Sequence, residues 1–160
     1  MTHIEEIMAY ISDFGTKCVA PILGLVALTG AASAYSATSA DVTVQIDNLR
    51  NDNGQLMVCL TDNPKAFPDC KKDASSLKKL MPASSHTLTF AGVSPGTYAV
   101  AVVHDENRNN KLDTRLFVPK EGFAFSRNPA IRMGPPKFES AAFAVGRSRS
   151  VQKLRMKYIF

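Results

Sequence analysis

The stretch DVTVQIDNLRNDNGQLMVCLT, residues 41–61, decides the fold class of this chain. In its first part, Val42, Val44 and Ile46 alternate with polar residues. A period of two is typical of a β-strand with one buried face, whereas an amphipathic helix repeats every three or four residues. The last part, GQLMVCLT, is apolar on both faces and indicates a strand in the middle of a sheet. The stretch therefore predicts two strands.

The four residues from Asn51 to Gly54 lie between these two strands. Asn, Asp and Gly are typical of tight hairpin turns, because Asn and Gly readily adopt a positive φ. We therefore expect the two strands to pair with each other in antiparallel orientation.

The period of two returns in HTLTF (residues 86–90), TYAVAVVH (97–104) and SVQKLRMKYIF (150–160), and FESAAFAV (138–145) completes the predicted strands. The small alanines on one face of the 97–104 strand suggest that another layer, or the loop that follows, approaches closely. Residues 62–82 are rich in Pro and Lys, and we expect mostly loop there, with at most one short helical turn.

The segment from Asp105 to about Lys137 contains several prolines and glycines and reads as one long loop. Loops of this length tend to be functional or to pack on themselves. Short strands with turn residues between them, and no amphipathic helix, predict a single all-β sandwich of six to eight strands with one long loop.

The N-terminal segment has the features of a Sec-type signal peptide. Residues 18–34 are apolar and uncharged, and small residues close the run at Ala34. We predict a signal peptide over residues 1–34, with cleavage as late as Ala40, and a sandwich domain over residues 41–160. The alternative is an uncleaved membrane anchor. Two acidic residues near the start do not suit a signal peptide, and translation from Met8 would remove them.

Cleavage would leave 18 basic and 11 acidic residues, a net charge of +7. This balance favours anionic partners, and export makes nucleic acid the weakest candidate. We expect a monomer in the periplasm or outside the cell, with an unknown envelope protein or an anionic polysaccharide as partner. The basic residues Lys153, Arg155 and Lys157 alternate on the last strand and are typical of a solvated face.

The domain retains two cysteines, Cys59 and Cys70. In an oxidising compartment, an even pair at short spacing predicts a structural disulfide. A redox pair would be expected as Cys-x-x-Cys, and a zinc site would need more ligands.

Four segments, LMVCLTDNPKAFPDC, SPGTYAVAVVHDENRNNKLD, PKEGFAFSRNP and FESAAFAV, give the chain a family resemblance. It resembles the bacterial secreted domain-of-unknown-function family 2141 over about residues 41–160. The resemblance implies an extracytoplasmic β-sandwich, immunoglobulin-like or transthyretin-like in outline. It implies no activity.

The run HDENRNNKLD, residues 104–113, fits part of a calcium-loop template, because alternating oxygen-bearing residues can surround one ion. Leu116 stands where an EF-hand has its bidentate Glu, so affinity would be weak. The candidate ligands are Asp105, Asn107, Asn109, Lys111 (through its carbonyl), Asp113 and Glu121. The alternative is a metal-free loop, because Asn and Asp at these positions also form Asx turns.

His104 ends the strand before this run. It is either a partly buried histidine that bonds to the long loop, or a metal ligand. In the second case a small metal-dependent hydrolase would use His104, Asp105, Asp113 and Glu121. The sequence contains no Gly-x-Ser-x-Gly motif, and the cysteines are assigned to the disulfide.

Three phenylalanines, Phe117, Phe123 and Phe125, lie in the predicted long loop. We expect them to pin the loop onto the sandwich as a minor core, with an exposed docking surface as the alternative. The sequence thus favours an exported, non-enzymatic binding module whose contact surface is the loop 104–128. The alternatives are the hydrolase and a structural envelope component with a basic surface.

Overall fold

The computed structural model describes residues 39–116, 118–132 and 134–160. The predicted signal peptide and Phe117 lie outside these residues. Within the described ranges, no helix combines the length and the apolar character needed to cross a membrane.

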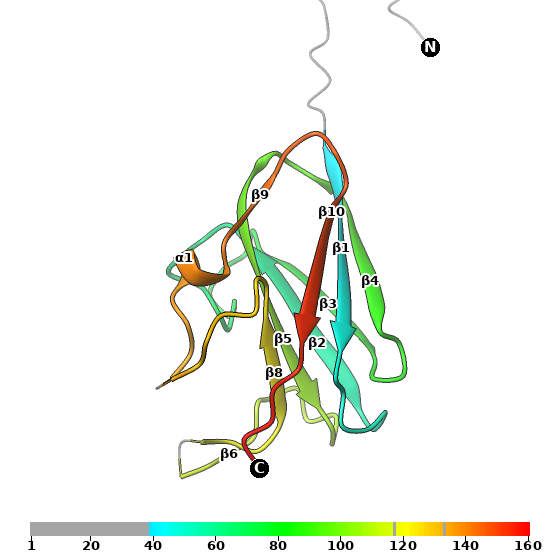
Figure 1. Ribbon diagram of the computed structural model, residues 1–160, viewed down its shortest axis with the longest axis vertical. Coiled ribbons are helices and arrows are strands. Elements are labelled where there is room, and N and C mark those ends of the chain that lie inside the picture. Colours follow the sequence, from blue (N-terminus) through cyan, green and yellow to red (C-terminus); the bar gives the residue numbers. More distant parts are fainter. Residues whose placement is uncertain (1–38, 117, 133) are drawn as a thin grey trace, which may run out of the picture. The chain divides into compact units, whose positions relative to one another are not determined.

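The described residues form a two-layered β-sandwich, which confirms the predicted fold class (Figure 1). The first layer has the strand order β10-β1-β4, and the second has the order β3-β2-β5-β8. Strand β9 pairs with the start of β5, and the short strands β6 and β7 pair with each other. The bounds are β1 Ala40–Asp47, β2 Gln55–Thr61, β3 Leu77–Pro82, β4 Thr87–Val93, β5 Gly96–Asp105, β6 Thr114–Arg115, β7 Val118–Pro119, β8 Gly122–Phe125, β9 Phe143–Val145 and β10 Ser150–Arg155.

The main core lies between the two layers. Alternate residues of β1 point inward, as the period of two predicts, and they meet the inner faces of β2 and β5. The largest fully buried side chains include Phe90, Ile46, Leu56, Leu60 and Leu154. Burial of such side chains stabilises the fold by about 1.5–3 kcal/mol each.

The predicted pairing of β1 with β2 is wrong. Strand β1 pairs with β4 and runs parallel to β10, whereas β2 pairs with β3 and β5 in the other layer. The residues from Asn48 to Gly54 therefore connect the two layers. Asn48 and Gly54 have positive φ values of 65° and 73°, and these two bends redirect the chain. Strand β2, apolar on both faces, takes the central place in the larger sheet.

The predicted loop over residues 62–82 is wrong in its last part, because Leu77–Pro82 forms the edge strand β3. Five of its six residues are exposed, so the strand shows no apolar period. Lysines such as Lys78 and Lys79 are typical of edge strands, where they oppose pairing with a further chain.

The predicted long loop after Asp105 is interrupted by strands. Strand β8 pairs with β5, and all four of its residues are buried, which again removes the alternation that marks a strand. The predicted strand 138–145 is divided into a four-residue helix, α1 (Phe138–Ala141), and the strand β9. At the C-terminus, the predicted strand 150–160 is shorter than expected, because β10 ends at Arg155 and Phe160 is 61% exposed.

A second, smaller core covers the outer face of β5. Ala99 and Ala101 pack there against Phe123, Phe125 and Phe138. The rings of Phe123 and Phe125 lie 5.8 Å apart, a distance typical of favourable aromatic pairs. The prediction that these two phenylalanines form a minor core is confirmed, and the small alanines leave room for it.

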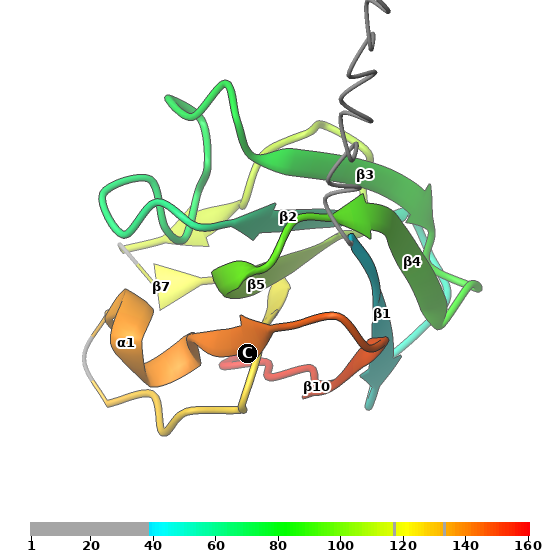
Figure 2. The same ribbon diagram turned by 90° about the horizontal axis from the view of Figure 1, so that it is seen from above.

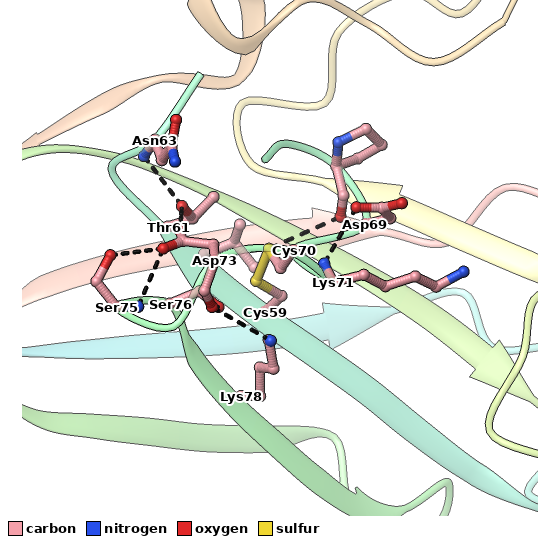
Figure 3. The surroundings of a disulfide bond; sticks show 12 residues. Cys59, Thr61, Asn63, Asp69, Cys70, Lys71, Asp73, Ser75, Ser76 and Lys78 are labelled. Carbon is pink, nitrogen blue, oxygen red and sulfur yellow. Dashed lines mark hydrogen bonds between the residues drawn. A yellow bond between two sulfur atoms is a disulfide. The ribbon is translucent and has the colours of Figure 1, made fainter. Parts of the chain in front are cut away.

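The disulfide between Cys59 and Cys70 is present, as predicted (Figure 3). It ties the connection after β2 back to the strand. Beside it, the Thr61 hydroxyl donates a buried hydrogen bond of 2.6 Å to the Asp73 carboxylate, which also accepts a hydrogen bond from the Ser75 hydroxyl. These contacts hold the irregular segment between β2 and β3 against the sheet.

Candidate functional site

The polar residues that the sequence singles out meet at one end of the sandwich, near the C-terminus in Figure 1. There β1, β5 and β10 end, and β2 and β8 begin. His104 and Asp105 are the last two residues of β5, and Glu121 immediately precedes β8. Arg50 comes from the connection between the two layers, and Tyr158 follows β10.

His104 is fully buried and bonds to two segments distant in sequence. Its Nε2 lies 2.8 Å from the carbonyl oxygen of Asn53, and its Nδ1 lies 2.8 Å from the Tyr158 hydroxyl. A carbonyl oxygen can only accept, so we assign the proton to Nε2, and the Tyr158 hydroxyl then donates to Nδ1. The same hydroxyl accepts the N–H of Arg50 at 3.2 Å. The prediction of a partly buried histidine bonded to the long loop is therefore wrong in both respects.

Arg50 connects Glu106 and Lys120 to the C-terminal segment. Its Nε and Nη2 donate to the two carboxylate oxygens of Glu106 at 2.6 and 3.0 Å, a bidentate geometry typical of strong ion pairs. Nη1 donates to the carbonyl of Phe160, and Nη2 also donates to that of Lys120. The guanidinium lies 4.7 Å from the centre of the Tyr158 ring. Hydrogen bonds from Arg50 lower the pKa of Glu106, although burial acts in the opposite direction.

We call residues 105–121 the rim loop. Asp105 is fully buried and organises the first half of this loop. One oxygen accepts the N–H of Asn109, and the other accepts the N–H of Asn110 and the amide of Gln55, at 2.7–3.0 Å. Burial alone would raise the pKa of this carboxyl group. The hydrogen bonds from Gln55 and from the backbone outweigh it, so the pKa is lowered.

Glu121 closes the rim loop. It is 4% exposed, and its two oxygens accept the backbone N–H groups of Glu106 at 3.1 Å and Asp113 at 2.9 Å. The Glu121 carboxylate therefore holds the segment 106–113 at both of its ends. Such charge-assisted hydrogen bonds are roughly twice as strong as neutral ones.

The alternating Asn and Asp residues form Asx turns. The side-chain oxygen of Asn107 accepts the N–H of Asn109, and that of Asn109 accepts the N–H of Lys111. The Asp113 carboxylate accepts the side-chain amides of Asn107 and Asn109. Asn110 has a φ of 61°, a left-handed conformation that Asn tolerates better than most residues.

Calcium binding stays a prediction for this loop. Each carboxylate of the candidate ligand set already accepts hydrogen bonds from the protein, and an ion would compete with these donors. Within the described ranges, no three His, Cys, Asp or Glu side chains are grouped in a way that could hold a metal ion. Thermal unfolding with millimolar calcium and with chelator measures the effect, because binding would raise the melting temperature.

A charged pocket opens beside this network. It has a volume of about 300 Å³. Two cations, three carboxylates and two amides line it: Arg50, Lys120, Glu106, Asp113, Glu121, Asn53 and Asn107. We call it the rim pocket. Asp113, Glu121 and Asn107 stand out in the sequence, but no local motif marks Arg50 or Asn53, which come from a distant segment.

Residues 44–153 match the model of a family described as an uncharacterized protein conserved in bacteria (DUF2141). The chain belongs to this family. The DUF2141 match covers most of both layers and confirms the resemblance seen in the sequence. No curated protein and no solved structure matches the chain.

The sequence segments that carry the DUF2141 resemblance have structural roles here. In EGFAFS, Glu121 holds the rim loop and the two phenylalanines fill the second core. The Ser126 hydroxyl accepts the N–H of Val100 and donates to the carbonyl of Ala141, which joins β5, β8 and α1. These contacts explain why the segment contains buried polar residues.

We expect the domain to lose stability at acidic pH. The pKa values of Asp105, Glu106 and Asp73 are lowered in the fold, mainly by hydrogen bonds that outweigh burial. A lowered folded-state pKa contributes stability above the unfolded value, about 4, and this stability is lost as the pH falls through the folded-state value. Melting temperatures measured from neutral pH downward should therefore fall steeply below about pH 4.

The variant Asp105→Asn tests whether the Asp105 carboxylate contributes to this loss of stability in acid. It should melt at a lower temperature at neutral pH and should show a shallower decline in acid. The exposed control Asp62→Asn should follow the wild-type curve. An acid decline that is as steep in Asp105→Asn as in the wild type would contradict a role for this carboxylate.

Proposed function

We propose that this DUF2141 domain is an exported, non-enzymatic binding module that uses the rim pocket and the rim loop as its contact surface. The observation that carries the proposal is the way the loop is held. Two buried carboxylates, Asp105 and Glu121, accept backbone N–H groups on all four oxygens. The pocket is thereby preorganised, and a preorganised surface loses less conformational entropy when it binds a partner.

The burial of the candidate catalytic groups supports binding over hydrolysis. His104 and Asp105 have no exposed surface, and both ring nitrogens of His104 take part in hydrogen bonds within the fold. A general base must come within hydrogen-bond reach of the proton that it removes from a substrate. These two groups instead bond to neighbouring segments of the fold and to the rim loop.

The charges of the rim pocket indicate the kind of partner. Arg50 and Lys120 stand beside three carboxylates, so the pocket complements a surface that carries both signs of charge. A segment of another envelope protein has this property, whereas a uniform polyanion would be repelled by the carboxylates. The partner of the rim pocket is therefore a protein segment.

The test uses chemical cross-linking of the purified domain in envelope extract, followed by mass spectrometry. Lys120→Glu reverses one exposed charge of the pocket, and Lys65→Glu makes the same change at an exposed site elsewhere. The expected result is a protein that the wild type and Lys65→Glu capture and that Lys120→Glu loses. Equal capture by all three, or no capture, would remove the pocket from the proposal.

Two further measurements test export and the absence of enzymatic activity. The mature protein recovered from the cell envelope should begin at Tyr35 or as late as Asp41, and recovery of residues 1–34 on a cytoplasmic chain would overturn export. Esters, phosphate esters and glycosides, offered with divalent metals, should remain intact. Turnover that rises with protein concentration and is lost in Glu121→Gln would restore the hydrolase.

A further inference from the structure

The positive charge of the domain is concentrated in one part of the chain. Residues 41–126 contain ten Lys and Arg and ten Asp and Glu, and are therefore neutral overall. Residues 127–157 contain eight Lys and Arg and a single carboxylate, Glu139. The whole net charge of +7 thus comes from this last segment, although the basic residues look scattered along the sequence.

The fold gathers this segment on one side of the domain. Figure 2 shows the connection after β8, then α1, β9 and β10, in gold, orange and red, along the same side. Four hydrogen bonds, made by three side chains, join the connection to its neighbours. The Asn128 side chain bonds to the backbone of Lys153 and Arg155, the ammonium group of Lys157 donates to the carbonyl of Pro129, and Arg127 donates to the carbonyl of Ala142.

Seven of the eight cations on this side are exposed, and Lys157 is half-buried. On β10, Lys153 and Arg155 flank the buried Leu154, so both side chains project outward from the first layer. Asp47 lies beside Arg155 in the register of the sheet. Nevertheless, in the part of the chain that the structure describes, none of the eight cations lies within ion-pair distance of a carboxylate. The eight are Arg127, Arg132, Lys137, Arg147, Arg149, Lys153, Arg155 and Lys157.

The backbone of β10 takes no part in this surface. Asn128 occupies the free edge of the strand by accepting the N–H of Arg155 at 2.7 Å and donating to the carbonyl of Lys153 at 2.8 Å. A β-strand of a partner could therefore not pair with β10 at this position, because Asn128 already bonds to its backbone. Recognition on this side depends on side chains.

We propose that this basic side, formed by the eight cations of residues 127–132 and 134–157, binds a linear anionic polysaccharide. Unpaired cations of one sign create a local positive potential that attracts an extended polyanion. Alternate residues of a strand lie roughly 7 Å apart, so Lys153 and Arg155 can contact successive anionic groups of one polymer. Arginine is suited to this task because its planar fork binds carboxylate or sulfate groups with two hydrogen bonds.

This inference does not depend on the rim pocket. The rim pocket has mixed charges and lies at one end of the sandwich, whereas the basic side has almost exclusively positive charges and follows β10. Lys120 and the three variant positions named below are different residues, so the two proposals can fail separately.

The test measures binding of fluorescently labelled polygalacturonate and dextran sulfate, with neutral dextran as the uncharged polymer. The triple variant Arg149→Gln, Lys153→Gln, Arg155→Gln removes three exposed charges whose side chains form no hydrogen bond or ion pair within the described residues. The matched control Lys65→Gln, Lys71→Gln, Lys72→Gln removes three exposed charges elsewhere, so the net charge of the two variants is the same.

The wild type should bind both anionic polymers and ignore neutral dextran, with binding that weakens as salt is added. The triple variant of Arg149, Lys153 and Arg155 should bind roughly tenfold more weakly, because several exposed charge contacts each contribute modestly. The control triple variant should bind like the wild type. Equal weakening of both variants would show attraction to bulk charge and overturn a defined surface. Binding only to phosphatidylglycerol vesicles or to single-stranded DNA would also overturn the proposal.

Discussion

Replacement of Gly54 by alanine should lower the free energy of unfolding by about 4 kcal/mol, through strain at positive φ and through overpacking. Gly54 has a φ of 73°, and a Cβ atom there would overlap the backbone of Asp105 and Glu106. These atoms are backbone and belong to the start of the rim loop, so they cannot turn aside as a side chain would. The melting temperature measures the effect.

Alanine substitutions at two other glycines distinguish strain at positive φ from overpacking. Gly92 has a similar φ of 69°, but the nearest atom to its Cβ position is the Ser39 hydroxyl at 3.9 Å. Gly92→Ala should therefore cost only about 1 kcal/mol, the strain of the left-handed conformation alone. Gly146 has open space around it, and Gly146→Ala should leave stability unchanged. A Gly54→Ala variant no less stable than Gly92→Ala would refute the importance of the close approach.

A strand with one buried face is visible in the sequence through its period, and β2, which is apolar on both faces, is visible through its continuous apolar run. Strand β1 alternates cleanly between buried and half-buried residues, so its period is visible in the sequence. Strand β3 is exposed on both faces and β8 is buried on both, and neither shows a period. A periodicity argument detects a difference between two faces, and these strands lack that difference.

The partners of each strand depend on contacts that the local sequence does not contain. Asn51 to Gly54 is a good hairpin sequence, but a hairpin would have placed β1 and β2 in one layer. Strand β1 instead pairs with β10, more than 100 residues later. The hydrophobic surface of β2 needs two neighbours, and β3 and β5 supply them. Tertiary burial therefore overrides the turn propensity.

The candidate site could be predicted only in its local part. His104 stands in one short run with Asp105, Asn107 and Asp113, and the alternating oxygen-bearing side chains of the last three are a recognisable pattern. Arg50 is separated from Glu106 by 56 positions, and the other rim contacts of Arg50 are similarly distant. No motif relates residues that far apart. The structure adds them, and they turn a calcium-like run into part of a hydrogen-bonded network.

Replacement of Gly122 by alanine should cost about 3 kcal/mol, because overpacking is followed by the loss of buried hydrogen bonds. A Cβ atom at Gly122 would overlap the Tyr158 ring. The ring would have to move away, and its hydroxyl would leave the Nδ1 of the fully buried His104 without a partner. The cation–π contact with Arg50 would be lost as well.

A double-mutant cycle distinguishes this mechanism from a general effect at Gly122. Tyr158→Ala removes the ring and should itself be destabilising, because His104 loses its partner. In that background, Gly122→Ala should cost only about 0.5 kcal/mol, the ordinary effect of a substitution without a clash. The coupling between the two sites, measured by denaturant unfolding, should therefore be large. If the two changes are additive, the packing of Tyr158 on Gly122 does not hold the rim together, and the buried histidine must be positioned by Asn53 alone.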